Sequence, residues 1–298
     1  MSDETSLSLF ALPPGARRTT LPTRRGEFAA LEAAPETPVR GTVLLLPGYT
    51  GSKDEFIPLL RAVTDAGYRA VAVDGRGQDA TTGPDEESAY AQEALVADVL
   101  AQAEALAVPV HLLGHSMGGQ VARAAVLTDR RPFLSLTLMS SGPAEVGDER
   151  AFLLKLLLDA LATMTMQQIW DVMQQLKPSA TTPADTELLR QRWLRNSPVQ
   201  LRVAGTRLLE EPDRTDELAA VTALPVHVLY GDRDDAWAPD LLADMARRLD
   251  AHRTVVADAE HSPNLQQPAA TAAALTSFWD ALPAAGDDGP PAGSTRRS

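Results

Sequence analysis

The sequence of 298 residues contains no cysteine, which excludes disulfide bonds, thiolate metal sites and a cysteine nucleophile. It has only five histidines, so few nitrogen ligands are available for zinc or iron. Basic residues are scarce as well, because 27 Lys and Arg stand against 40 Asp and Glu, a formal net charge of −13. Nucleic acids and anionic membranes bind basic surfaces. We therefore expect no metal site and no nucleic-acid partner.

Long hydrophobic runs and nucleotide-binding glycine patterns are missing too. The most apolar stretch, 151–164, is interrupted by Lys155 and Asp159, whereas a membrane-spanning helix needs about 18 apolar residues. The first four residues include two acidic ones, Asp3 and Glu4, whereas a secretory signal begins with basic residues. No G-x-G-x-x-G pattern follows a predicted strand, and no phosphate-binding loop is present. These absences predict a cytoplasmic protein without a cofactor or membrane insertion, and they leave its oligomeric state open.

The remaining pattern is that of a globular α/β protein with a mostly parallel central sheet and helices on both faces. Runs of leucine and β-branched residues predict buried strands at 41–46, 69–73, 110–113, 134–139, 226–230 and 254–257. Helical patterns lie between them at 54–66, 86–106, 117–128, 239–249 and 266–281. The segments 17–22 and 27–32 are expected to add an antiparallel hairpin at one edge.

One region interrupts this alternation. Between about 143 and 211 there is no strand-like run, but four helical patterns, at 150–161, 165–176, 185–194 and 199–210. A helical insertion between two strands predicts a cap over the carboxyl edge of the sheet, where open α/β folds bind ligands. We thus expect a core of 1–142 and 213–282, a helical cap of 143–212 and a disordered tail of 283–298.

The segment Gly114-His115-Ser116-Met117-Gly118 matches the G-x-S-x-G nucleophile elbow between a predicted strand and a predicted helix. Small residues are needed two positions before and after the serine, because the turn is sharp. The serine would need a base and an orienting acid, in the chain order Ser, Asp or Glu, His.

Three histidines follow the elbow. His227 lies inside a predicted strand and His252 in a polar turn, which favour a core role and a solvated position. His261 follows the last strand, on the same edge as Ser116, and is the predicted base. The acid is expected in the loop after 226–230, which offers three candidates that spacing alone does not separate: Asp232, Asp234 and Asp235.

An oxyanion hole takes one backbone N–H from the residue after the nucleophile and one from the loop after the first central strand. Met117 and Tyr49 occupy these positions, and the loop Leu46-Pro47-Gly48-Tyr49-Thr50-Gly51 contains two glycines.

These motifs together resemble the α/β-hydrolase fold, with esterase- or lipase-like serine hydrolases as the nearest type, over about residues 17–282. The resemblance implies that Asp234, three residues after Gly231, is the acid. Members commonly carry His-Gly where this chain has Pro47-Gly48, and a histidine where it has Gln78. A serine at position 116 separates it from the dehalogenase and epoxide hydrolase branches, which use aspartate.

The predicted function is cleavage of a carboxylic ester or thioester of a small, largely apolar molecule through an acyl-enzyme. Peptidase, lactonase or C–C hydrolase activity would use the same residues. A non-hydrolytic enzyme, such as a cofactor-free haloperoxidase, acyltransferase or lyase, and a binding protein without activity are the other classes.

The cap region is rich in large apolar residues and has no Arg or Lys cluster. At least half of these residues are expected to pack within the cap and onto the core. The others predict an apolar wall for an acyl or alkyl group, formed by Met164, Trp170 and Met173, with Trp237 from the acid loop.

Overall fold

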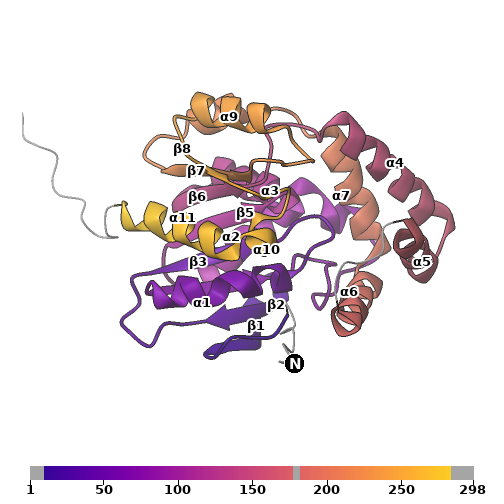
Figure 1. Cartoon of the computed structure of the whole chain (residues 1–298), viewed down its shortest axis with the longest axis horizontal. Helices are drawn as coiled ribbons and strands as arrows, with labels where there is room; N and C mark the ends of the chain where they lie inside the picture. Colours follow the sequence, from indigo (N-terminus) through magenta and orange to yellow (C-terminus); the bar gives the residue numbers. More distant parts are fainter. Residues whose placement is uncertain (1–9, 177–181, 283–298) are drawn as a thin grey trace, which may run out of the picture.

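The computed structural model describes residues 10–176 and 182–282. Within these residues, eight strands form one sheet in the order β1-β2-β4-β3-β5-β6-β7-β8 (Figure 1). The strands are β1 (Ala16–Thr23), β2 (Gly26–Ala33), β3 (Gly41–Leu46), β4 (Tyr68–Val73), β5 (Val110–His115), β6 (Phe133–Met139), β7 (Val226–Gly231) and β8 (His252–Val256). From β4 to β8 all neighbours are parallel, whereas β1 and β2 form an antiparallel hairpin at one edge. The predicted α/β architecture and the edge hairpin are confirmed.

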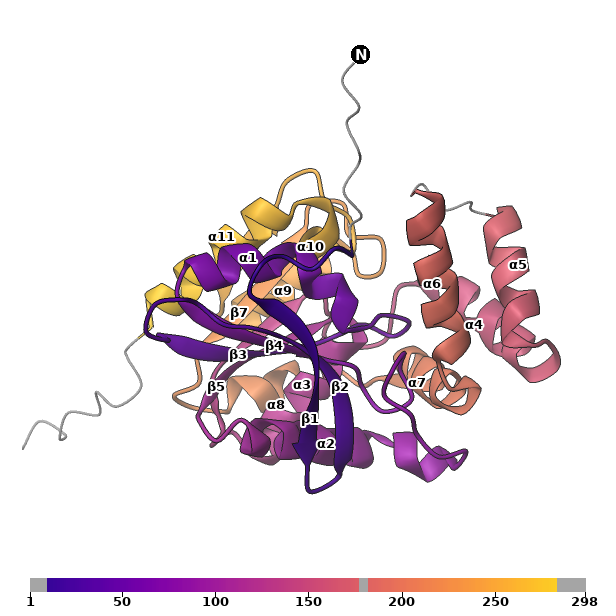
Figure 2. The same cartoon turned by 90° about the horizontal axis from the view of Figure 1, so that it is seen from below.

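Two layers of helices cover the sheet. One face packs against α1 (Ile57–Asp65) and α11 (Pro268–Asp280), and the other against α2 (Gln92–Ala105), α3 (Met117–Thr128) and α9 (Pro239–Arg248). Figure 2 shows α1 and α11 together on one side of the strands, with α2 and α3 on the opposite side. Both faces of the central strands are therefore buried, which explains their almost continuous apolar sequences.

Three predicted helices are divided in the structure. The pattern at 54–66 forms a 3₁₀ helix, η1 (Lys53–Phe56), followed by α1, and the pattern at 266–281 forms α10 (Pro263–Gln266) followed by α11. Pro58 and Pro268 stand at the starts of α1 and α11, since proline has no N–H to continue a helix from the preceding turn. The segment 86–106 likewise divides into η2 (Glu87–Tyr90) and α2, and a short helix, α8 (Thr215–Ala219), was not predicted.

Four further helices lie between β6 and β7 and form a separate block beside the core (Figures 1 and 2). They are α4 (Asp148–Thr163), α5 (Met166–Leu176), α6 (Pro183–Arg195) and α7 (Pro198–Glu210), called the cap helices below. Their positions agree with the four predicted helical patterns. The division into core and cap domains stays a prediction, and the expected tail at 283–298 lies outside the described residues.

Buried charges connect the cap helices to the core. Lys53 places its ammonium group 2.7 Å from Asp74 and 2.9 Å from Asp79, and all three side chains are almost fully buried. Arg195, at the end of α6, donates from Nε to the other oxygen of Asp79 at 2.7 Å. The carboxylate of Asp79 thus bonds both to Lys53, just after the loop that contains Tyr49, and to Arg195 at the end of α6.

In the part of the chain that the structure describes, no helix has the length and apolar character needed to cross a membrane.

Candidate active site

Ser116 lies between the end of β5 and the start of α3, in the turn that the sequence predicts. Its backbone has φ of 54° and ψ of −122°, outside the conformations that residues with a side chain normally adopt. The N–H of Ser116 donates to the carbonyl oxygen of Met139 on β6 at 2.9 Å, and its own carbonyl accepts from Gly119 at 2.9 Å. Hydrogen bonds on both sides therefore hold the strained residue in place.

The two glycines of the elbow are required by close backbone contacts. A Cβ on Gly114 would lie 2.3 Å from the carbonyl oxygen of Gly118. A Cβ on Gly118 would lie 2.5 Å from the carbonyl oxygen of Pro47, in the loop after β3. The second contact brings the elbow directly against the predicted oxyanion loop.

A chain of hydrogen bonds runs from Ser116 through His261 to Asp234. The His261 Nε2 atom lies 3.0 Å from Ser116 Oγ, and its Nδ1 atom lies 3.1 Å from Asp234 Oδ1. The same Asp234 oxygen accepts from the backbone N–H groups of Ala236 and Trp237, which orient the carboxylate. The structure thus brings Asp234 and His261 to a serine that lies more than a hundred positions before them in sequence.

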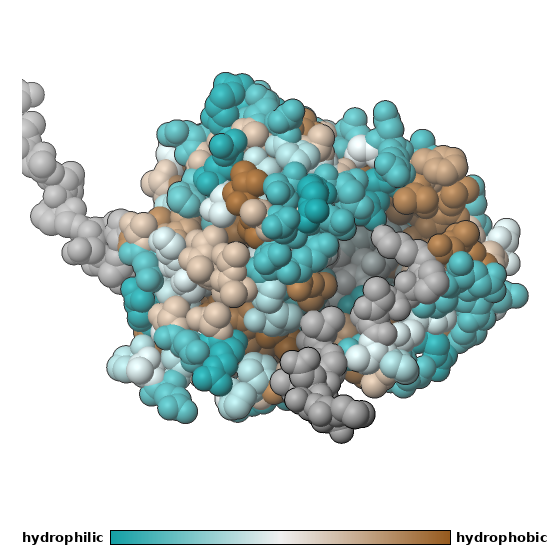
Figure 3. Space-filling view, in the orientation of Figure 1, coloured by the Kyte–Doolittle hydropathy of each residue, from teal (hydrophilic) through white to brown (hydrophobic). Residues whose placement is uncertain are grey.

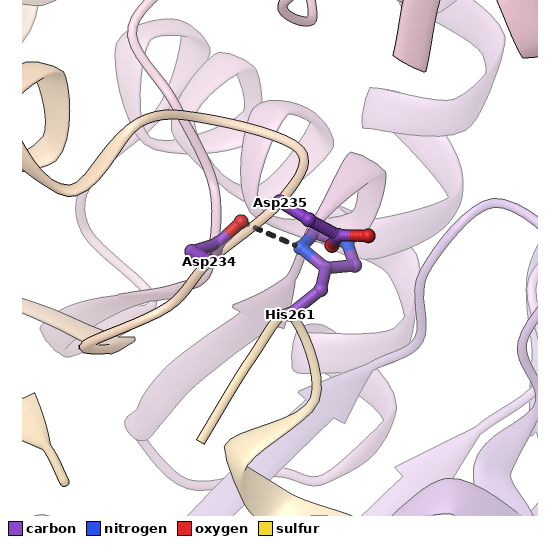
Figure 4. A group of neighbouring side chains, drawn as sticks. All are labelled: Asp234, Asp235 and His261. Carbon is purple, nitrogen blue, oxygen red and sulfur yellow. Dashed lines mark hydrogen bonds and ion pairs between the residues drawn. The ribbon is translucent and has the colours of Figure 1, made fainter. Parts of the chain in front are cut away.

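The other two candidate acids point to different partners. Asp235 accepts a hydrogen bond from Arg150 at 2.9 Å, and Asp232 accepts from the backbone N–H of Ala259 at 3.3 Å. In Figure 4 only Asp234 is joined to His261 by a hydrogen bond. Asp234, Asp235 and His261 have ligand atoms within 4.8 Å of one another. Since these atoms already pair with each other and with Arg150, they fit a proton relay better than a metal site.

The remaining histidines have other surroundings. His227 is buried and bonds through Nε2 to Thr254 Oγ1 at 2.9 Å, and His252 is exposed. His111 bonds through Nδ1 to Ser135 Oγ at 2.9 Å in the core. None of the three contacts Ser116 through a hydrogen bond within the described chain.

Burial and charge set the protonation of the relay. Burial lowers the pKa of His261 below its usual value, because it disfavours the imidazolium form, and the hydrogen bond that His261 donates to Asp234 only partly offsets this effect. Burial raises the pKa of Asp234, but the hydrogen bond and charge of His261 and the two backbone N–H groups outweigh it, so the pKa falls overall. Near neutral pH the pair is therefore a neutral imidazole and an ionised carboxylate, as a general base requires.

The backbone N–H groups of Tyr49 and Met117 are the predicted oxyanion donors, and neither donates to another described residue. The loop that contains Tyr49 is fixed by Gln78, whose side-chain amide donates to the carbonyl oxygens of Gly48 at 2.8 Å and Tyr49 at 3.1 Å. The Tyr49 hydroxyl donates to Leu201 of α7 at 2.5 Å. The glutamine that replaces the histidine common in the resembling family thus orients the oxyanion loop.

A buried pair of Glu55 and His115 joins the three loops of the site. His115 Nδ1 lies 2.7 Å from Glu55 Oε1, and His115 Nε2 lies 2.9 Å from the carbonyl oxygen of His261. The same Glu55 oxygen accepts from the N–H of Gly48 at 3.3 Å, and the Glu55 carbonyl accepts from Asn264 at 2.8 Å. The pair therefore connects the oxyanion loop, the elbow and the segment that carries His261.

Both ring nitrogens of His115 face oxygen atoms. Nε2 donates its hydrogen to the carbonyl oxygen of His261, and a second hydrogen lies between Nδ1 and the Glu55 carboxyl group. Burial lowers the pKa of His115, but the charge and hydrogen bond of Glu55 outweigh burial and raise it overall. Glu55 could not be identified from the sequence, because it lies 60 positions before His115 in an ordinary-looking polar segment. The feature that sets Glu55 apart is the burial of its charged side chain, which only the fold reveals.

A cavity of about 360 Å³ opens above Ser116 and His261. It is lined by the loops of the core and by the cap helices, mostly with apolar side chains. The apolar lining includes Val146, Leu153, Leu154, Leu157, Met173, Trp193, Leu208 and Leu265. Of the four substrate-contacting residues expected from sequence, Met173 alone is part of this lining.

Three expected pocket residues lie elsewhere. Trp170 is buried between the cap helices, with Met164 packed against the same cluster, so both stabilise the cap instead of lining the cavity. Trp237 is buried behind His261 and donates from its indole N–H to Glu145 at 2.9 Å. The spacing of apolar residues along a helix does not show which of them pack against other cap helices and which face the cavity.

Several other apolar cap residues are exposed instead of packed. Figure 3 shows a hydrophobic surface over α4 and α5. The exposed side chains on these two helices are Phe152, Leu153, Leu156, Val172, Met173 and Leu176. Since Leu153 and Met173 also line the cavity, this surface continues to its mouth.

The geometry defines a candidate nucleophile, base, acid and oxyanion hole at the carboxyl edge of a parallel sheet. The sequence model of the alpha/beta hydrolase family matches residues 43–274. The chain belongs to this family.

The match to an individual relative is shorter than the match to the family. A protein of Variovorax paradoxus (strain S110) named as a carbamate hydrolase, RutD, is 34% identical over 100 residues. The match covers 33% of this chain and 37% of the relative, so this chain spans little more than a third of that protein's length.

Two solved structures show the similarity of the fold. A thermophilic esterase from Thermogutta terrifontis is 23% identical, with a TM-score of 0.70 over 89% of this chain and 98% of its own. A bromoperoxidase from Bacillus anthracis is 15% identical, with a TM-score of 0.73 over 89% of this chain and 100% of its own.

Glu55→Gln keeps the size of the side chain but removes its charge. Without the carboxylate, His115 loses the partner of its imidazolium form, and the oxyanion loop and the His261 segment lose a common anchor. We expect kcat for a substrate that the protein turns over to fall about tenfold, less than the ~10²–10³ that follows loss of an oxyanion donor, with little change in KM. Steady-state kinetics measure both constants.

The matched control is Glu104→Gln, which removes an exposed carboxylate paired with Arg24. It should leave both constants unchanged. If a folded Glu55→Gln protein, verified by circular dichroism, turns over as fast as the wild type, Glu55 does not position the site.

Proposed function

We propose that this protein is a serine hydrolase that cleaves carboxylic esters through an acyl-enzyme. The observation that carries the proposal is the hydrogen-bonded chain from Ser116 through His261 to Asp234, at the floor of a largely apolar cavity. A serine hydroxyl is a weak nucleophile alone, and a base that is itself oriented by an acid activates it.

In the proposed mechanism, Ser116 Oγ attacks the ester carbonyl carbon while His261 Nε2 takes the hydroxyl proton. Asp234 stabilises the imidazolium that forms, without taking the proton. The negative charge that develops on the carbonyl oxygen is bound by the N–H groups of Tyr49 and Met117. Collapse of this intermediate breaks the bond to the alcohol, which leaves with the proton from His261, and the acyl group stays on Ser116.

Hydrolysis completes the cycle. A water molecule gives its proton to His261 and attacks the acyl carbonyl carbon. The second tetrahedral intermediate collapses to a carboxylic acid, and the proton returns from His261 to Ser116 Oγ. The same chemistry would cleave a carbamate, which the similarity to RutD makes the second candidate substrate class.

Ser116→Ala and His261→Ala should each lower kcat by roughly 10⁴–10⁶, because the members of such a relay act as a unit. The measurement is hydrolysis of a panel of 4-nitrophenyl esters, with circular dichroism to verify folding. Ser277→Ala and His252→Ala, which alter an exposed serine and an exposed histidine, are the matched controls. Substantial turnover by folded Ser116→Ala would remove this serine as the nucleophile.

The pH dependence should reflect the environment of His261. Because burial lowers its pKa from the usual 6.5, the neutral base persists to lower pH than an exposed histidine would allow. We expect kcat/KM to rise with pH through a midpoint below 6.5 and then to level off. Two esters with different leaving groups should give the same midpoint, and a midpoint well above 6.5 would rule out a buried His261 as the base.

A further inference from the structure

Two arginine side chains from different cap helices line the cavity above Ser116. Arg150 belongs to α4 and Arg192 to α6. Among the lining residues in the described part of the chain, Glu55 is the one acidic side chain, and it is paired with His115. The cavity wall therefore has an excess of positive charge, although the whole chain has a net charge of −13.

Arg150 lies near the reacting groups. It donates to Asp235 at 2.9 Å, and Asp235 has a carboxylate oxygen within 4.8 Å of ligand atoms of His261 and Asp234. Burial lowers the pKa of His261 most, and the positive charge of Arg150 adds to this effect. The positive charge of Arg150 therefore acts on His261, although the negative charge of Asp235 neutralises part of it.

Arg192 has no such partner. Its side chain is half-buried, and within the described residues its guanidinium forms neither an ion pair nor a hydrogen bond. Neighbouring arginines of α6 are all paired: Arg190 bonds to Glu187, and Arg195 bonds to Asp79. Leaving a partly buried guanidinium unpaired has an energetic cost that an anion in the cavity would offset.

Apolar side chains share the wall with the two arginines. Leu153, Leu154 and Leu157 face the cavity from α4, and Trp193 is adjacent to Arg192 on α6. A ligand that fits this wall has an apolar chain with a negative group at one end. A carboxylate is the suitable group, because its two oxygens match the planar fork of one guanidinium.

We propose that the cavity binds esters that carry a free carboxylate, with Arg192 as its main partner and Arg150 as a second cation. This inference rests on the proposed function, because it places the ester bond at Ser116. It also corrects the expectation of a cap without clustered cations: Arg150 and Arg192 are 42 positions apart, and only the fold brings them to one cavity.

Paired esters that differ by one charge test the proposal. Mono-4-nitrophenyl adipate has its carboxylate on the acyl side, and 4-carboxyphenyl hexanoate has it on the alcohol side. Each is compared with its neutral methyl ester. We expect kcat/KM to favour the anionic member of at least one pair by about tenfold, the size of one charged hydrogen bond, and the favoured pair locates the carboxylate.

Arg192→Gln should lower this anionic-to-neutral ratio about tenfold, and Arg192→Lys should keep part of it. The matched control is Arg202→Gln, a half-exposed arginine of α7 outside the cavity, which should leave the ratio within about twofold. Equal rates for both members of both pairs, or a preference that survives Arg192→Gln, overturn the proposal.

Calorimetry separates this site from the hydrolytic function. Monomethyl adipate should bind Ser116→Ala more tightly than dimethyl adipate does, and adding Arg192→Gln should abolish the difference. Such binding without turnover of any ester would refute the hydrolase and retain the carboxylate site. Turnover of esters without this difference in binding would refute the carboxylate site alone.

Discussion

The strained backbone of Ser116 is the constraint on which the candidate site depends. A residue held at a φ of 54° costs on the order of 1–3 kcal/mol, so the surrounding structure must fix it. Close packing of Gly114 and Gly118 provides this restraint, and the contact of Gly118 with the carbonyl of Pro47 places the oxyanion loop beside the serine. One tight turn between β5 and α3 thus determines where the proposed nucleophile and the N–H groups proposed to bind an oxyanion lie.

Polar contacts between loops then align the other groups. Gln78 orients the carbonyls of the oxyanion loop, and the buried pair of Glu55 and His115 ties this loop to the segment of His261. Such a pair needs complete hydrogen bonding to be tolerated away from water, and both ring nitrogens of His115 are satisfied. The three relay residues thus lie in the segments that follow β5, β7 and β8, and the buried pair connects the elbow to the segment that carries His261.

The positions of the strands along the chain and the elbow could be predicted because they depend on local sequence. Buried parallel strands are continuous apolar runs, and the elbow needs small residues at fixed positions. Asp234 could be preferred to its neighbours only through the family resemblance, because three carboxylates in one turn have the same local pattern. The cap was less predictable: an apolar stripe shows that a helix packs, but Trp170 packs within the cap whereas Leu154 faces the cavity. Glu55 could not be predicted because its partner, His115, is distant in sequence. Arg192 could not be predicted because only the fold shows that it lines the cavity.

The most direct test is to quench the reaction of the wild-type protein with a 4-nitrophenyl ester in acid within the first turnover and to analyse its peptides by mass spectrometry. The account predicts a burst of nitrophenolate close to one equivalent when deacylation is slower than acylation, with the acyl mass on the peptide that contains Ser116. Sustained ester hydrolysis with an acyl group found on another residue, or with undiminished activity after Ser116 has been blocked by a fluorophosphonate, would contradict it.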